Sequence, residues 1–469
     1  MRRLLLAAFV TAIPVMAVRA DDGQPIRIVL HPKGPPSPVL RYPLLPELRH
    51  RKSGNTAPLY READKKLAPF TRDLGDGYHE RLDQWRLAPL KELPREQMHA
   101  WFTKIGPVLH DVETAARCET CDWELTAALC EKGVGVRLDG VQALRGFTAE
   151  FGVRARLALA EGRIEDALRD VQTMFAMARH ANSGPTLICA LVAAALTNSA
   201  CDVLQEVIQE PNAPNLYWSL TDLPAPFIDL KSAFQGERLA GYGAFPGMGR
   251  FARDRTSAPL TPDECTKLTA DLLLGSTTTR VSLGKEILRK HEAAKRVLIG
   301  DGWQAASLEK MPHLQVAMLR VFVDYESVLD EMRKLTSLPF WQAAPALEEL
   351  YKRLAKAPQS ELDAPIVPFG LQLFRPHASV IEARTRCERR LAVLRCIEAI
   401  RLYAAAHGGR LPTKLADIQE VPVPLDPFTG QFLEYRVMGE RATLSSSGRP
   451  VFGVRDSPRD RVAYDLAVK

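Results

Sequence analysis

The feature that most constrains the fold is a long stretch, residues 138–208, in which apolar residues recur every three or four positions. This spacing places them on one face of an α-helix. It is clearest in the middle of the stretch, at Ile164, Leu168, Val171, Phe175 and Ala178. Gly162 and the run Asn-Ser-Gly-Pro at 182–185 separate three helical segments. We therefore expect three consecutive helices, stacked antiparallel.

Two shorter runs within this stretch refine the prediction. LICALVAAAL, from Leu187, is apolar on all sides, and its ten residues are too few to cross a bilayer. It predicts a helix buried in the core. RLALAEGRIEDALRDV resembles one tetratricopeptide unit, with Ala158, Gly162 and Ala167 where paired helices touch. No second copy follows at a period of about 34 residues, so an ordinary helical hairpin is the favoured interpretation.

The start of the chain has the pattern of a secretion signal. Arg2 and Arg3 precede a 15-residue apolar run, and small residues mark a cleavage site after Ala20. The run is shorter than the ~20 residues of a membrane-spanning helix. We expect a Sec-type signal peptide over residues 1–20 and a mature chain that begins at Asp21. An uncleaved membrane anchor is the alternative.

Charge argues against a nucleic-acid partner. The formal net charge is +6, and cleavage would remove three arginines and no acid, which lowers it to +3. The sequence pI of 8.8 therefore does not reflect the concentrated basic stripe that nucleic-acid binding requires. We expect an extracytoplasmic protein, periplasmic or secreted, with no membrane span in the mature chain. Its partner would be an unidentified protein or envelope component.

Composition and periodicity divide the rest of the chain. Residues 21–58 are rich in proline and predict an extended arm. Residues 59–360 predict a helical domain, and an irregular connector leads to a last domain at 376–469. The predicted fold class is mainly α: stacked antiparallel helices, helical-repeat-like, with a small C-terminal α+β domain. We expect β-structure to be concentrated after residue 420.

The local motif closest to known chemistry is CETCDWELTAALC, which contains Cys118, Cys121 and Cys130. A C-x-x-C pair exchanges disulfides when its environment lowers a thiol pKa. Here both flanks predict helix and carry acids, which would raise it. Haem attachment requires a histidine where Asp122 stands, and zinc would need a fourth ligand. We expect a structural disulfide or buried thiols, with redox activity or a metal as weaker alternatives.

Helix geometry limits how the other cysteines could pair. Cys387 and Cys396 lie nine residues apart in a predicted helix, and Cys189 and Cys201 lie twelve apart. Neither pair can bring its Cα atoms within the ~7 Å that a disulfide needs. Any disulfide would have to join other partners, and the connectivity stays open.

No other catalytic pattern is present. The sequence has no G-x-S-x-G motif, no P-loop and no zinc-protease helix. His180 ends a predicted helix, where a capping role is favoured over a catalytic one. Trp123, Tyr217 and Trp218 could line a pocket, although core packing is the alternative. We expect no catalytic residue, no cofactor and no metal ligand.

The end of the chain carries a resemblance to a known family. CIEAIRLYAAAHGGRLPTKLADIQEVPVPLDPFTGQFLEYRV is similar to the globular tail of pseudopilins. The resemblance implies a helix that ends near Tyr403, a glycine turn, a short helix at 415–418, a turn at Asp426 and a hairpin of FLEYRV and ATLSSS. We expect the tail, 376–469, to fold onto its own helix, from about Val380, without polymerising.

The departures from that family are substantial. The chain lacks a membrane-spanning N-terminal helix with an early glutamate, and SSSGRP replaces the acidic pair of the family's calcium loop. Calcium is therefore not carried over. The whole arrangement also resembles uncharacterised secreted bacterial proteins, which implies architecture but no activity.

Three functional hypotheses follow. The first is an exported, non-enzymatic helical scaffold or binding protein of the cell envelope. The second is an accessory subunit of a secretion or pilus-like system. The third is an extracytoplasmic enzyme, either a thiol–disulfide enzyme or a hydrolase, whose site is assembled from distant residues.

Overall fold

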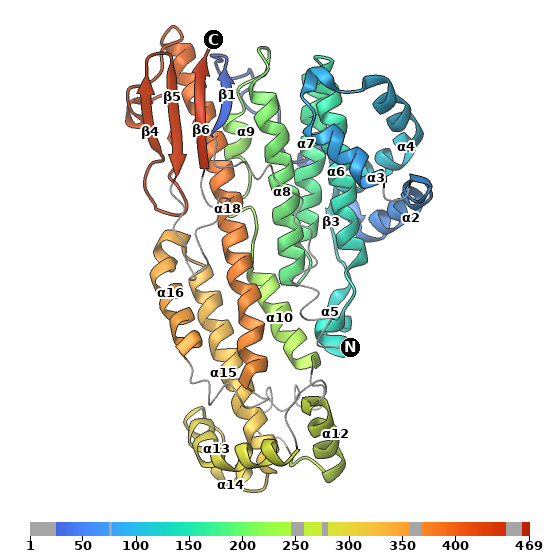
Figure 1. Cartoon of the computed structure of the whole chain (residues 1–469), viewed down its shortest axis with the longest axis vertical. Helices are drawn as coiled ribbons and strands as arrows, with labels where there is room; N and C mark the ends of the chain where they lie inside the picture. Colours follow the sequence, from blue (N-terminus) through green and yellow to red (C-terminus); the bar gives the residue numbers. More distant parts are fainter. Residues whose placement is uncertain (1–24, 75–76, 245–257, 274–279, 357–366, 447–461) are drawn as a thin grey trace.

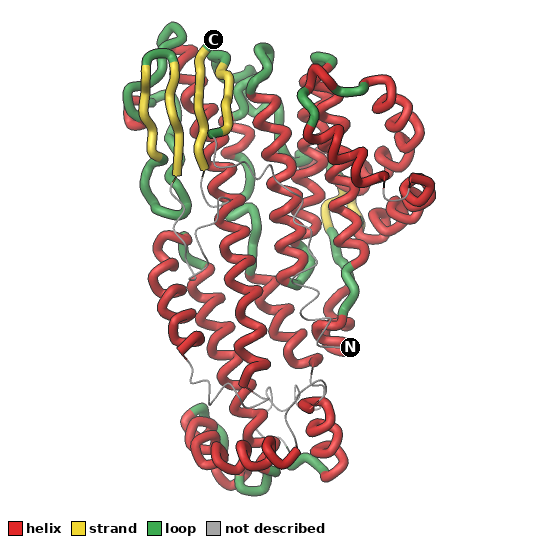
Figure 2. The backbone as a smooth tube through the Cα atoms, viewed as in Figure 1, coloured by secondary structure: helices red, strands yellow, loops and turns green. Residues whose placement is uncertain are grey.

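The computed structural model shows a mainly helical protein with one small sheet at one end of its long axis (Figure 1 and Figure 2). Helices make up 66 % and strands 8 %, which confirms the predicted mainly α fold with a small C-terminal α+β part. The predicted signal peptide and its cleavage site lie outside the described residues. The structure describes residues 25–74, 77–244, 258–273, 280–356, 367–446 and 462–469.

Three antiparallel helices form the centre of the molecule: α6 (Asp139–Ala160), α7 (Ile164–Asn182) and α8 (Leu187–Ile208). They are separated at the predicted breaks. Gly162 has a φ of 75°, a conformation that suits glycine and ends α6. Thr186 caps α8 by accepting a hydrogen bond from the Cys189 N–H at 3.1 Å. The predicted hairpin is confirmed, and its resemblance to a tetratricopeptide unit stays a prediction.

The third helix is longer than the apolar run that predicted it. Among the described helices, α8 alone is long and apolar enough, by length and composition, to cross a membrane. In the structure it lies among α6, α7 and α18 (Val367–Ala406), and 67 % of its most apolar window is buried. Its burial matches the predicted core helix.

Helix α18 runs alongside α8 and also packs against the short helix α9 (Tyr217–Thr221) (Figure 1). It ends at Ala406, close to the predicted end near Tyr403, but begins at Val367, inside the stretch predicted to be an irregular connector. Pro368 falls in its first turn, where the missing N–H of proline costs no hydrogen bond. The prolines therefore did not mark the helix start.

The N-terminal helices cover another side of α6. α2 (Ala57–Leu74), α3 (Gly77–Leu87) and α4 (Arg95–Ala116) pack against it. A two-stranded parallel pair joins the segments that flank these helices: β2 (Lys52–Asn55) lies before α2, and β3 (Cys118–Thr120) lies after α4.

The other helices lengthen the molecule away from the sheet (Figure 1). They include α5 (Leu125–Lys132), α10 (Lys231–Ala244), α15 (His313–Thr336) and α16 (Phe340–Lys356). At the far end, α12 (Pro262–Leu273), α13 (Arg280–Gly300) and α14 (Ala305–Leu308) pack on the first half of α15 around a second, separate hydrophobic core. We call this part the distal module.

The sheet contains the predicted hairpin and two further strands. β4 (Glu434–Met438) and β5 (Arg441–Ser446) form the predicted hairpin, and β6 (Val462–Val468) adds antiparallel to β5. β1 (Ile26–Leu30) then pairs parallel with β6, so the order is β1-β6-β5-β4. The last domain was predicted to span 376–469, but a strand from the proline-rich segment completes its sheet and buries Ile28 and Leu30.

A buried ion pair on α18 connects this helix to the segment after β1 and to the segment after α8. Arg401 and Glu398 on α18 are both fully buried and bonded at 2.9 and 3.0 Å. Arg401 also donates to the backbone carbonyl of His31, just after β1, and to that of Ala213, between α8 and α9. One guanidinium therefore joins three separate segments.

A second buried arginine connects α18 to the sheet. Arg389 donates to the Ser446 hydroxyl at 3.2 Å, and its guanidinium lies 4.1 Å from the centre of the Phe428 ring. The Ser446 hydroxyl donates to the buried carboxylate of Asp426, whose other oxygen accepts the Phe428 N–H. The predicted turn at Asp426 is thus connected to α18 through β5.

The close packing of α10 against the turn between α7 and α8 predicts that one added methyl group will lower the stability of the protein. A Cβ added at Gly236 on α10 would lie 1.5 Å from the Pro185 carbonyl oxygen, which is backbone and cannot rotate away. We expect Gly236→Ala to lower the free energy of unfolding by about 3 kcal/mol. At Gly146 on α6 a Cβ would meet nothing within 4 Å. Gly146→Ala should therefore be neutral or stabilise by about 0.5–1 kcal/mol. Urea unfolding followed by circular dichroism measures both, and equal values would contradict the packing.

Candidate functional site

The C-x-x-C motif lies at the edge of the helical core, between α4 and α5. Cys118 begins β3 and Cys121 follows it; both are buried, whereas Cys130 on α5 is exposed. The prediction of helix on both sides is correct, but the motif itself pairs with β2 as a short strand. All eight cysteines are free thiols, so of the two predicted alternatives the structure has buried thiols at Cys118 and Cys121.

The surroundings of Cys121 suppress thiolate chemistry. Burial raises the pKa of the Cys121 thiol to about 12, an effect that a contact with Ser183 only partly opposes and that Asp122 increases. The Ser183 hydroxyl donates to the Cys121 carbonyl oxygen and to that of His180 at 2.8 Å. A thiol in this state is a poor nucleophile at neutral pH.

His180 is a buried neutral side chain rather than a cation at a helix end. Its Nε2 lies 3.1 Å from the Cys118 carbonyl oxygen, which can only accept, so Nε2 carries the hydrogen. Its Nδ1 accepts from the Tyr60 hydroxyl at 2.9 Å. Burial, followed by the nearby Arg179, lowers the pKa of His180 to about 3. The predicted capping role was therefore wrong, because both ring nitrogens bond groups outside α7.

Trp123 packs against Tyr60 and bonds to the backbone of His180. Its indole stacks on the Tyr60 ring, with centroids 6.2 Å apart, and its N–H donates to the His180 carbonyl oxygen at 2.9 Å. Only 3 % of its surface is exposed. We call Tyr60, Cys118, Cys121, Trp123 and His180 the cysteine–histidine cluster. Its polar atoms bond to one another and to nearby backbone groups.

Tyr217 and Trp218 lie elsewhere. Tyr217 is buried at the start of α9, where its hydroxyl donates to the Pro422 carbonyl oxygen and Arg395 of α18 lies over its ring. Trp218 packs edge-on against Tyr217 and is 36 % exposed. Since Trp123 packs on α2 and α7, whereas Tyr217 and Trp218 lie together on α9, the three aromatics do not gather in one place.

The sequence analysis missed a buried acid, Glu150 on α6. Its carboxylate accepts from the Tyr78 hydroxyl of α3 at 2.8 Å and from the Trp101 indole of α4 at 2.9 Å. Burial raises the pKa of Glu150 to about 7, although both hydrogen bonds act in the opposite direction. A signal was present: Glu150 falls between Phe147 and Phe151 on the apolar face of its helix.

A second acid with a raised pKa, Glu237, contacts the start of α8. The Glu237 carboxylate on α10 accepts the Leu187 N–H at 3.1 Å, and burial raises the pKa of Glu237 to about 7. The Tyr325 hydroxyl of α15 donates to the Glu237 carbonyl oxygen at 3.1 Å. The group satisfies a free backbone donor at a helix N-terminus, which is a structural role.

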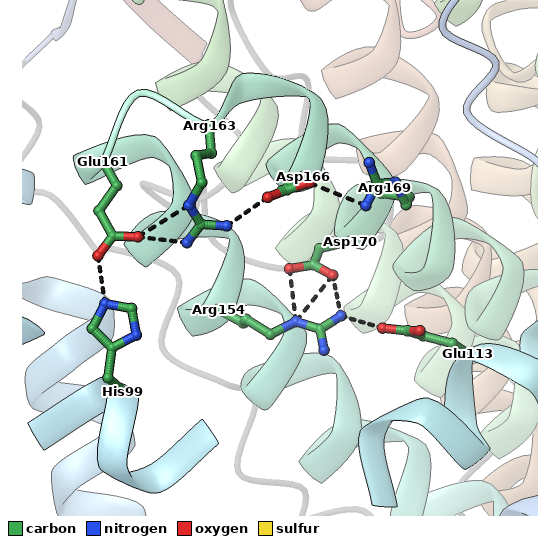
Figure 3. A network of polar contacts seen from close by, with 8 residues as sticks. All are labelled: His99, Glu113, Arg154, Glu161, Arg163, Asp166, Arg169 and Asp170. Atoms are coloured by element: carbon green, nitrogen blue, oxygen red, sulfur yellow. Dashed lines mark hydrogen bonds and ion pairs between the residues drawn. The ribbon is translucent and has the colours of Figure 1, made fainter. Parts of the chain in front are cut away.

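Charged residues between α4, α6 and α7 form the network of Figure 3. Arg154 bonds Asp170 and Glu113, and thereby joins the three helices. Burial raises the pKa of Asp170 to about 6, against the effect of Arg154. At the α6–α7 turn, Arg163 bonds Glu161 and Asp166, and Glu161 also contacts His99. Each acid in the network faces a cation.

The arrangement offers no metal centre. Among the described residues, no group of three or more histidine, cysteine, aspartate or glutamate side chains is placed to hold a metal ion. Arg156 bonds Glu206 on α8 at 2.7 Å and donates to the backbone carbonyls of Trp85 and Ala88. Arg156 therefore serves to join α6 to α8 and to the end of α3.

Comparison of the chain with protein-family models, with curated proteins and with solved structures found no match. The resemblance of the tail to pseudopilins therefore rests on its own residues and stays a prediction.

The state of the thiols can be tested directly. Six of the eight cysteines are buried, Cys265 is half-buried and Cys130 is exposed. We expect a thiol reagent to modify Cys130 rapidly in the native protein, Cys265 more slowly, and the other six only after unfolding. Mass spectrometry of the labelled protein measures this, with Cys130→Ser as the control that removes the fast phase. Rapid labelling of Cys118 or Cys121 would contradict the geometry.

The raised pKa of Glu150 predicts that the free energy of unfolding depends on pH. Because its pKa is raised above the ordinary 4.5, the stability it contributes is present below about pH 4.5 and is lost as the pH rises through about 7. We expect Glu150→Gln to reduce the fall in unfolding free energy between about pH 5 and pH 8 by roughly 1–3 kcal/mol. Part of the fall remains, because Glu237 is unchanged.

The matched control is Glu96→Gln, at an exposed position on α4. It should keep the wild-type pH dependence. Denaturant unfolding at a series of pH values measures all three proteins, and an unchanged slope in Glu150→Gln would exclude the predicted titration.

Proposed function

We propose that this chain is an exported helical scaffold of the cell envelope that acts by binding through its surface. One observation carries the proposal: the residues best suited to chemistry are buried and bonded within the protein. In the cysteine–histidine cluster, both ring nitrogens of His180 have protein partners. Glu150 accepts two hydrogen bonds from neighbouring helices. A catalytic group must instead reach a substrate.

The thiol–disulfide alternative has less support. Such an enzyme needs a thiol that ionises near neutral pH and can be approached by a disulfide. Cys118 and Cys121 are buried, and the pKa of Cys121 is raised to about 12. The exposed Cys130 has no second cysteine beside it in sequence. A hydrolase assembled from distant residues also lacks support at Glu150, since both of its carboxylate oxygens already accept hydrogen bonds.

The role of an accessory subunit in a secretion or pilus-like system is favoured by the tail alone. α18 ends at Ala406, Gly408 and Gly409 both have positive φ, and a short helix, η4 (Leu415–Asp417), precedes the turn and hairpin. However, α18 packs on α8 and α9 of the same chain. Its contacts are therefore already used within the monomer, which argues for a subunit that does not enter a filament by this helix.

Fractionation of the cells that make this protein tests the proposal. We expect the chain in the extracytoplasmic fraction, with Asp21 as its first residue, because the apolar start has the composition of a cleaved signal. N-terminal sequencing of the purified protein measures this. A cytoplasmic marker enzyme is the control for leakage. Recovery of the chain in the cytoplasm with its first twenty residues intact would overturn the proposal.

A further inference from the structure

Helix α13 of the distal module has two distinct apolar faces. One faces the second core and consists of Leu283, Ile287, Ala294 and Leu298. The other is exposed: Val281 by 69 %, Leu288 by 61 % and Ile299 by 43 %. At 3.6 residues per turn, their separations of 7 and 11 residues place these three side chains within roughly 20° of one line along the helix. We call them the α13 stripe.

Positive charge lies beside this stripe. Lys285, Arg289 and Arg296 are exposed, and by helix geometry they lie within roughly 80° of it. The whole helix carries six basic and two acidic residues. Its surface is therefore apolar along one line and basic along the next.

Of these three cations, only Arg289 pairs with an acid of α13. Glu286 pairs with Arg289 at 2.7 Å and with Lys290 at 2.9 Å, and Glu292 pairs with Lys295 at 3.5 Å. Within the described residues, Lys285 and Arg296 make no ion pair. These two cations remain available to an external anion.

The helix is also accessible in the whole molecule. The distal module lies at the end opposite the sheet, and α13 runs across that end rather than along the bundle (Figure 1). Its main contacts among the described elements are with α15 and α14. The stripe and its basic neighbours point away from that core, since the buried face of the helix is a different one.

We infer that α13 docks the distal module onto an anionic lipid bilayer. Aliphatic side chains next to long basic ones suit the boundary between acyl chains and headgroups, where the chains enter and the cations meet lipid phosphates. A second copy of the chain is a poorer match, because two basic faces repel each other. A stable protein interface needs on the order of 1,000 Å² of shaped contact, which a line of three side chains does not provide.

Binding of an anionic bilayer by α13 would specify what the proposed scaffold binds. It rests on the proposed function, because a protein of the cell envelope meets such a membrane. Vesicle sedimentation with the purified chain tests it separately from location in the cell. We expect binding to phosphatidylcholine vesicles that contain about 30 mol % phosphatidylglycerol, and release in high salt. Pure phosphatidylcholine vesicles should bind at least about tenfold less.

Two variants test the face itself. Leu288→Asp removes the centre of the stripe, and Lys285→Glu combined with Arg296→Glu reverses the free charges. Because these side chains are exposed, the fold should be kept, which circular dichroism checks. Each variant should weaken binding to the anionic vesicles at least about tenfold. Two control variants carry the matched changes on α2. One has Leu59→Asp, and the other has Lys65→Glu together with Arg72→Glu. Both should bind the anionic vesicles as tightly as the wild type does.

Several results would overturn the inference: no binding to anionic vesicles, equal binding to neutral ones, or α13 variants that bind as tightly as the wild type. Binding of soluble polyglutamate by a chain that does not bind vesicles would point to an acidic protein as the partner. This result would also overturn the inference. Vesicle binding by a chain that cells retain in the cytoplasm would contradict the proposed function alone.

Discussion

The structure depends on one buried interaction, the ion pair of Arg401 and Glu398. Removing two charges from water is costly, and it is offset only where their hydrogen-bonding groups find partners. Here Arg401 bonds both carboxylate oxygens and the carbonyls of His31 and Ala213. The pair therefore specifies where the segment after β1 and the segment after α8 meet α18. It connects the segment after the first strand to the last long helix, next to the backbone bond from the Lys33 N–H to the Arg401 carbonyl oxygen.

The same principle recurs through the bundle. Arg154 joins α4, α6 and α7, Arg156 joins α6 to α8 and to the end of α3, and Arg390 bonds Asp202 across the α8–α18 contact. An apolar helix face alone permits several registers, whereas a buried cation with specific partners permits few. These buried charges therefore fix how the neighbouring helices are aligned. The α13 stripe is the surface feature that combines exposed apolar and basic groups.

Local sequence predicted a large part of this architecture. Three-four apolar spacing identified α6, α7 and α8, and the glycine and proline breaks between them fell where the helices end. The hairpin of β4 and β5 followed from alternating residues around a tight turn. The same reasoning could not find Glu150 as a site, because its partners Tyr78 and Trp101 come from helices distant in sequence. It also could not decide whether Cys118 and Cys121 were bonded or free.

What the sequence determined by itself was the three central helices, the end of α18 and the hairpin, since each depends on residues a few positions apart. Only the tertiary structure decided that β1 completes the C-terminal sheet, that His180 is neutral, and that Trp123 and Tyr217 serve separate parts of the core. The physical reason is that burial and hydrogen-bond partners are properties of contacts between distant segments. A parallel strand from the start of the chain has no local signal for its partner, and a histidine acquires its charge state from what surrounds it.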